Sequence, residues 1–300
     1  MAAACLGVAV GVTACGQILG ISGWVDVGAA DAATDGQAAT DGGALTDASG
    51  GNEGPPGAEG SCQSPVEGGM AGVLIEGPGA SPYCIDSTET TMALYQRFLD
   101  DPTINPPQGA PSECAWNDAY GFEYDNPYGA GFDASAYPVT AVNWCDAWGF
   151  CRYWGKRLCG NRTDGGAVDP AVANKPESEW YYACAGPDGN EYPYGTTYQA
   201  DLCRTGLSPS AGPGVVPTQT CVGSVPGLFD MSGNLAEWEN SCSPSDAGDP
   251  RLDGCLTRGG TFFFPGDSVT CDLINGGAVN PRWGGQGGSD GVTIRCCWDP

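Results

Sequence analysis

The sequence contains no histidine, and this absence excludes several kinds of catalytic and metal site. Serine–histidine and cysteine–histidine nucleophile pairs, histidine-ligated haem, and histidine-bound iron or zinc all require the imidazole ring. Basic residues are also scarce, since 11 Lys and Arg stand against 36 Asp and Glu, and the formal net charge is −25. This charge repels nucleic-acid backbones and anionic lipid surfaces, so we expect no nucleic-acid partner.

Aliphatic side chains are scarce as well, whereas cysteine is abundant, with 16 residues. None of the tight cysteine spacings of zinc sites occurs, so we expect disulfides and an oxidising compartment. The sequence also has 9 Trp and 12 Tyr. A compact domain would therefore rest on aromatic burial and cross-links more than on an aliphatic core.

The first 15 residues, MAAACLGVAVGVTAC, are small and apolar and too short to span a bilayer. Small residues before Cys15 resemble a bacterial lipobox, although no Lys or Arg precedes them. We expect Cys15 to carry a lipid, which would be the protein's only contact with the membrane and would anchor it outside the cytoplasm on the bacterial envelope. The alternatives are a misassigned start or a plain apolar stretch, and a false lipobox would leave a secreted protein.

Residues 16–61 consist mainly of Ala, Gly, Asp and Thr, with no basic residue. Such a stretch cannot bury enough apolar surface to offset its conformational entropy, so we predict a disordered acidic tether. From residue 62 to residue 300, cysteines, tryptophans and charges of both signs appear. We predict that residues 62–300 form a single folded domain.

The folded part contains three apolar patterns at helical spacing and two short strand-like runs. The three tryptophans of the second pattern, Trp144, Trp148 and Trp154, are expected in the core rather than on a sugar-stacking surface. Few regular elements among many Gly and Pro residues indicate a mixed α+β fold. The expected helices are residues 91–99 after Thr90 or Thr91, residues 144–154 between Asn143 and Gly155, and residues 176–186 from Pro176 to Gly186; the strand-like runs are 261–264 and 292–295.

Six segments in order resemble the formylglycine-generating enzyme family, also called sulfatase-modifying factor domains. The resemblance implies one irregular, disulfide-rich α+β domain related to the C-type-lectin fold. The segments are CIDSTETTMALYQRFL (84–99), YPVTAVNWCDAWGFCRYWGKRLC (137–159), ESEWYYACAG (177–186), GLFDMSGNLAEWENSC (227–242), TRGGTFF (257–263) and GVTIRC (291–296).

In active members of the family, two cysteines bind copper(I), and oxygen-dependent oxidation converts a client sulfatase cysteine into formylglycine. The resemblance places Phe264 and Val269 at these two positions, and neither side chain binds copper. We therefore expect no copper and a non-catalytic domain that is structural or binds a peptide or glycan. The iron-dependent sulfoxide synthases of the superfamily bind their metal through histidines, which this sequence lacks.

An alternative keeps oxidoreductase activity through a rearranged thiol site, formed by Cys271 with Cys296 or Cys297. Extracytoplasmic cysteines more often form disulfides, so we expect one of the adjacent pair to bond to Cys271 and the other elsewhere.

The family also binds calcium through a segment like the present FDMSGNLAEW. The resemblance implies a structural Ca²⁺ held by side-chain oxygens of Asp230 and Glu237 and by the carbonyls of Gly233 and Leu235. Calcium prefers such oxygen ligands, about 6–8 in number. The alternative is that Asp230 and Glu237 only cap turns.

Three arginines, Arg258, Arg282 and Arg295, match basic positions near the family's substrate groove. The resemblance implies that they contact a carboxylate or a peptide backbone of the ligand. Buried structural ion pairs are the alternative, because cations are scarce in this chain.

Overall fold

The structure is a computed structural model. It describes residues 61–104, 109–122, 128, 133–171, 176–218, 220–274 and 291–300. All of these belong to one compact unit of the chain, residues 49–300. Residues 1–60 and Arg282 lie outside the described residues, and so do the predicted signal, almost all of the predicted tether and Cys15.

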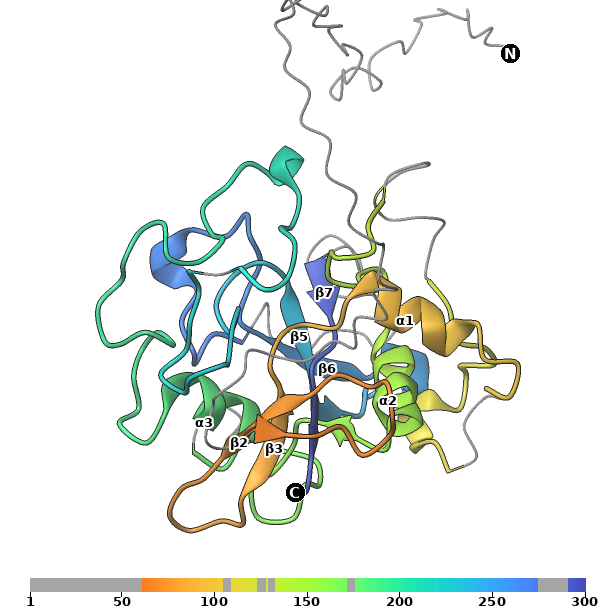
Figure 1. The fold of residues 1–300 in the computed structure, drawn as a ribbon. Coiled ribbons are helices and arrows are strands. Elements are labelled where there is room, and N and C mark those ends of the chain that lie inside the picture. The colour runs from red at the N-terminus through yellow and green to blue at the C-terminus, as the bar shows by residue number, and fades with distance from the viewer. Residues whose placement is uncertain are drawn as a thin grey trace, which may run out of the picture. The chain divides into compact units, whose positions relative to one another are not determined.

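Two small sheets organise this unit (Figure 1). The larger has the strand order β1-β2-β3-β8-β4 with antiparallel neighbours, and the smaller has the order β6-β5-β7 with β7 parallel to β5. The late strand β8 lies between β3 and β4, so the end of the sequence is built into the larger sheet. The strands are β1 Ser61–Cys62, β2 Gly72–Ile75, β3 Tyr83–Asp86, β4 Arg157–Leu158, β5 Ala236–Ser243, β6 Gly254–Arg258, β7 Val292–Thr293 and β8 Cys296–Trp298.

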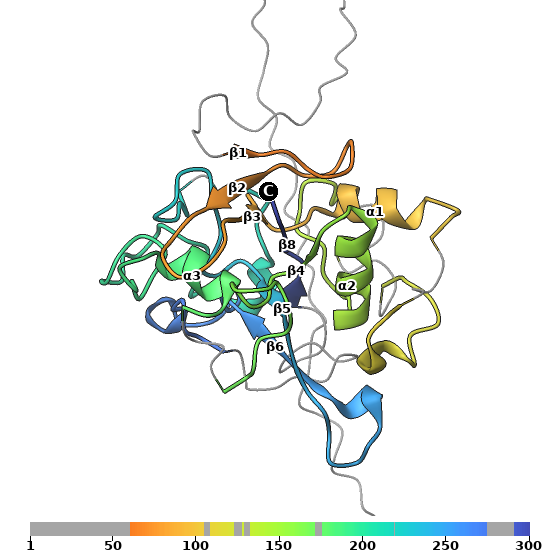
Figure 2. The same cartoon turned by 90° about the horizontal axis from the view of Figure 1, so that it is seen from below.

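The helices α1 Met92–Leu99, α2 Trp144–Tyr153 and α3 Glu179–Ala185 confirm the three helical patterns. Helices α1 and α2 lie side by side in both views (Figures 1 and 2). The described residues also contain four single-turn 3₁₀ helices: η1 Ser112–Cys114, η2 Pro209–Ala211, η3 Pro250–Leu252 and η4 Gly266–Ser268.

Side-chain caps explain where the helices begin. The Thr91 side chain accepts a hydrogen bond from the Leu94 amide, which selects Thr91 over Thr90 as the cap of α1. Asn143 and Asp146 form a reciprocal capping box at the start of α2, as the sequence predicts for Asn143.

Three expected boundaries differ from the structure. Helix α3 begins at Glu179 because Ser178 caps it, so Pro176 lies before the helix rather than in its first turn. The run 261–264 is not a strand, since the Phe264 amide donates back to the Thr261 carbonyl and closes a turn. Strand β7 ends at Thr293, and the next strand begins only at Cys296.

The core is aromatic, as the composition predicts. Tyr95 and Phe98 of α1 pack against Phe150 of α2 with ring centroids 5.6 and 5.7 Å apart. Trp144 and Trp154 are 2% and 4% exposed. These tryptophans therefore serve packing, as expected, and Trp148 is partly buried beside them.

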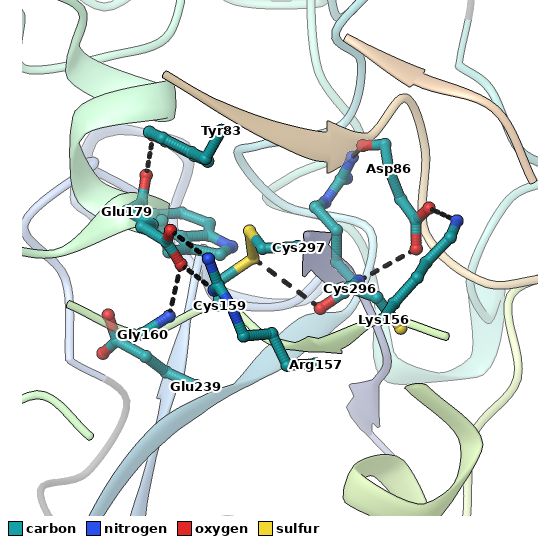
Figure 3. The surroundings of a disulfide bond; sticks show 12 residues. Tyr83, Asp86, Lys156, Arg157, Cys159, Gly160, Glu179, Glu239, Cys296 and Cys297 are labelled. Carbon is teal, nitrogen blue, oxygen red and sulfur yellow. Dashed lines mark hydrogen bonds and ion pairs between the residues drawn. A yellow bond between two sulfur atoms is a disulfide. The ribbon is translucent and has the colours of Figure 1, made fainter. Parts of the chain in front are cut away.

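Seven disulfides cross-link the described residues, in accordance with an oxidising compartment. The expected bond between Cys271 and one of the adjacent pair is wrong, because Cys296 and Cys297 alternate across β8 and bond to opposite neighbours. Figure 3 shows Cys297 bonded to Cys159. The pairs are 62–84, 114–145, 151–296, 159–297, 184–271, 203–221 and 242–255. Within the described ranges, no helix has the length and apolar character needed to cross a membrane.

Candidate functional site

The segment that leads into β5 is a tight turn with three residues in the left-handed region. The φ angles are 59° at Asp230, 77° at Gly233 and 55° at Asn234. A Cβ on Gly233 would lie 2.4 Å from the Arg204 carbonyl oxygen, so glycine is required there. In this conformation the side chains of residues 230–235 are buried against the core.

Asp230 is 1% exposed and has one unsatisfied oxygen. Its Oδ2 accepts a hydrogen bond from the Thr218 amide at 2.8 Å, whereas Oδ1 is buried with no partner among the described residues. Burial, together with the nearby charge of Glu237, raises the pKa of Asp230 to about 6. A buried carboxylate oxygen without a donor is a position that a cation would satisfy.

Glu237 is fully buried in β5 and is held by two donors. Arg295 donates from Nε to Oε2 at 2.7 Å and from Nη2 to Oε1 at 2.8 Å. Trp180 donates from its indole nitrogen to Oε2 at 2.7 Å. Three of the roughly four acceptor positions of this carboxylate are therefore used, and one on Oε1 remains.

A third buried carboxylate, Glu89, belongs to the same cluster, and the sequence analysis did not single it out. It precedes α1 and accepts hydrogen bonds from the Leu235 amide at 3.0 Å and from Asn234 Nδ2. Burial and the charges of Asp230 and Glu237 raise the pKa of Glu89 well above its usual range. The position of this lone acid, between threonines in the segment STETT, was the only signal for it in the sequence.

The charges of this cluster bear on the calcium prediction. Fully ionised, Glu89, Asp230 and Glu237 would carry three negative charges against the single positive charge of Arg295. Burial and this excess of negative charge raise the pKa values of Glu89 and Asp230, and a divalent cation would neutralise the excess. In the described part of the chain, no three Asp, Glu or Cys side chains form a complete metal cluster. Calcium here would therefore depend on main-chain oxygens, such as the predicted carbonyls of Gly233 and Leu235. The charge and the unpaired oxygen fit calcium, and its binding stays a prediction.

Phe264 and Val269, which the resemblance matches to the family's copper ligands, lie close to this turn, where Ser232 donates a hydrogen bond to the Val269 carbonyl. Val269 is 1% exposed, and a Cβ on Gly260 would meet it at 2.4 Å and Phe264 at 3.5 Å. The Phe264 ring is half-buried and makes an edge contact with Phe263, with centroids 5.2 Å apart. Neither side chain offers a metal ligand.

The cysteines considered for a rearranged thiol site are not together. Cys271 is bonded to Cys184 of α3, whereas Cys296 and Cys297 hold β8 to α2 and to the end of β4. Every cysteine in the described ranges is disulfide-bonded. The described part of the chain thus provides no thiolate.

The buried alternative holds for two of the three arginines. Arg258 and Arg295 are 0% exposed and pair with Glu239 and Glu237 at 2.8 and 2.7 Å. These contacts favour the alternative of buried structural ion pairs, and a contact of either arginine with a ligand stays a prediction. Arg282 lies outside the described residues.

One family model and several solved structures are similar to this chain. The model of the sulfatase-modifying factor enzyme 1-like domain matches residues 78–296. Among solved structures, CarF is 18% identical, with a TM-score of 0.48, and the match covers 73% of this chain and 87% of CarF. PvdO from Pseudomonas aeruginosa is 15% identical, with a TM-score of 0.48 and coverage of 77% and 84%. Treponema denticola variable protein 1 is 17% identical, with a TM-score of 0.45 and coverage of 80% and 94%.

The family match spans most of the folded part of the chain and contains the turn, the buried carboxylates and the two positions occupied by Phe264 and Val269. The protein therefore belongs to the sulfatase-modifying factor family, the formylglycine-generating enzyme family that its sequence motifs resemble.

Proposed function

We propose that this chain is a non-catalytic member of its family, which presents the domain as a binding or structural module outside the cytoplasm. The observation that carries the proposal is the pair Phe264 and Val269, which puts apolar side chains where copper(I) needs two thiolates. The disulfides support it, because the described cysteines, including Cys271, are all oxidised. No observation favours the alternative of an oxidase with rearranged thiols.

Anaerobic titration with Cu(I) tests the loss of the copper site. We expect no stoichiometric high-affinity binding and no conversion of a cysteine-containing sulfatase peptide to formylglycine. The double variant Phe264→Cys/Val269→Cys is the matched control, because it restores two thiols on the same backbone. Tight Cu(I) binding by the natural protein, or a free thiol detected by alkylation without reduction, would overturn the proposal.

Aromatic side chains next to these positions support a peptide or glycan as the ligand. The Tyr192 and Tyr194 rings are stacked 5.4 Å apart, and Tyr198, which is 37% exposed, lies beside Tyr192. Tyr192 donates to the Asp267 carbonyl of η4, so the cluster adjoins the segment between Phe264 and Val269. Tyrosines with an apolar face and a polar tip are typical of such binding surfaces.

Peptide and glycan arrays, with Tyr198→Ala beside the natural protein, test this surface. We expect the variant to lose binding to the ligands that the natural protein selects, while Tyr181→Ala, a change on α3, keeps it. A structural domain with no ligand would select nothing on either array.

We also propose that Cys15 anchors the protein to a membrane through a lipid and that residues 16–61 separate the anchor from the domain. Growth with a labelled fatty acid should label the natural protein and not Cys15→Ser. An unlabelled natural protein would favour a secreted form.

A further inference from the structure

A pocket of about 440 Å³ lies where the β2–β3 loop, the segment after β4 and the start of α3 meet. Neither Phe264 nor Val269 lines this pocket. Its volume falls in the range of small-molecule sites. The charged and phenolic groups that line it are Tyr83, Arg157, Arg162, Asp164, Glu179 and Asp299.

Arg162 is a largely buried cation in the wall of this pocket. It is 7% exposed, and its guanidinium carbon lies 3.5 Å from the centroid of the Tyr182 ring. Nη1 donates to the Pro176 carbonyl at 3.1 Å, whereas Nε is buried with no acceptor. Arg162 forms no ion pair with any residue in the described ranges. A buried charge of this kind is costly unless an anion pairs with it.

Arg157, on the same pocket, is already bound by carboxylates. Glu179 accepts from Nη1 and Nη2 at 2.5 and 2.8 Å, and Figure 3 shows the two side chains facing each other. Asp299 accepts from Nη2 at 3.0 Å, although its side chain is 86% exposed. An exposed ion pair of this kind is weak, so another carboxylate can displace Asp299.

We propose that this pocket binds the carboxylate group of a small molecule. Arg162 supplies a charged guanidinium donor for the carboxylate, and Arg157 becomes a second donor when Asp299 is displaced. Asp164 and Glu179 line the same pocket, so a singly charged carboxylate is favoured over sulfate or phosphate. This binding site lies beyond the proposed function and does not depend on it.

Calorimetric titration with two monocarboxylates tests the site. Glucuronate represents an acidic sugar, and N-acetylglycine represents the carboxyl end of a peptide; sulfate is the doubly charged comparison. We expect saturable binding of at least one carboxylate and weaker binding of sulfate. The preferred carboxylate identifies the source of the group.

Three variants locate the site. Arg162→Gln should weaken carboxylate binding by about tenfold or more, because it removes a charged donor. Asp299→Asn should strengthen binding severalfold, because it removes the competing carboxylate. Asp246→Asn removes an exposed carboxylate elsewhere and should leave the affinity unchanged, which controls for the net charge.

The Asp299 and Asp246 variants alter exposed side chains, so their comparison stands even if the Arg162 variant unfolds. The proposal is overturned by no saturable binding of either carboxylate, by sulfate binding as tightly as the carboxylates, or by equal affinities of the Asp299→Asn and Asp246→Asn proteins.

Discussion

Arg295 and Glu237 face each other in the interior, with Arg295 Nε 2.7 Å from Glu237 Oε2 and neither side chain more than 1% exposed. Arg295 also donates to the main-chain carbonyls of Asp86 and Phe229. One guanidinium thus joins β5, the end of β3 and the turn before Asp230. Through Arg295, the family segment GVTIRC therefore cross-links three parts of the fold.

Breaking this pair should be strongly destabilising. Arg295→Met leaves Glu237 buried without its cation, and we expect the free energy of unfolding to fall by about 3–5 kcal/mol. The double variant Arg295→Met/Glu237→Met should lose less than the sum of the two single changes, because neither member of the pair is left buried without the other. Urea denaturation measures all three.

The surface pair of Arg251 and Asp249 is the control. Arg251→Met should change the free energy of unfolding far less than Arg295→Met, because exposed pairs contribute little. Additive effects at Arg295 and Glu237 would contradict a direct interaction between them.

The disulfides should differ in their contribution to stability according to the loop that each closes. Cys184 and Cys271 are separated by 87 residues, whereas Cys242 and Cys255 are separated by 13. On the chain-entropy account, removing the first bond costs roughly 4–5 kcal/mol and removing the second roughly 3 kcal/mol. Denaturation of the two double Cys→Ala variants measures the difference. A larger loss for the shorter loop would contradict this order.

Removal of calcium should lower the thermal unfolding midpoint at neutral pH. The buried carboxylates Glu89, Asp230 and Glu237 outnumber Arg295, so a bound cation would stabilise the native state. A chelator should lower the midpoint of the natural protein, added Ca²⁺ should restore it, and Asp230→Asn should abolish both responses. Asp246→Asn, a change of equal charge on the surface, should retain them. An unchanged midpoint in the natural protein would show that Asp230 serves only the turn.

Tyr120 should make stability depend on pH in the alkaline range. Burial and the charge of Asp146 raise its pKa from 10.0 to about 12. The folded pKa exceeds the unfolded value, so this stabilising contribution is complete below about pH 10 and is lost as the pH rises towards 12. Denaturation between pH 9 and 12 should show a steeper decline for the natural protein than for Tyr120→Phe. Parallel declines would contradict the raised pKa.

Features that depend on neighbouring residues could be predicted from the sequence. The cap at Asn143 works because its side chain meets the amide of Asp146, three residues further on. Pro176 suits a first helical turn, so the sequence predicts that α3 starts there. In the structure Ser178 caps the helix instead, and its hydroxyl also donates a hydrogen bond to Glu239. A distant partner thus favoured one of two locally acceptable starts.

The functional residues divide in the same way. The sequence alone is enough to propose that Phe264 and Val269 stand at the copper-ligand positions, because the motif around them is continuous. Glu89 could not be joined to the carboxylate cluster in this way, since 148 positions separate it from Glu237 and only folding brings their charges together. The sequence could not predict that Arg162 lacks an ion pair within the described part of the chain, because this depends on which carboxylates the fold places near its guanidinium group.

By itself, the sequence determined the class of the domain and its family. It also showed that the protein has no imidazole and that it has enough cysteine to predict cross-linking. Tertiary structure alone decided how the cysteines pair and which charges are neutralised. Cys296 and Cys297 are adjacent in sequence, yet alternation along β8 directs them to opposite partners, Cys151 and Cys159. Disulfides and buried ion pairs depend on distances in space, which are set only when the two sheets and the helices pack.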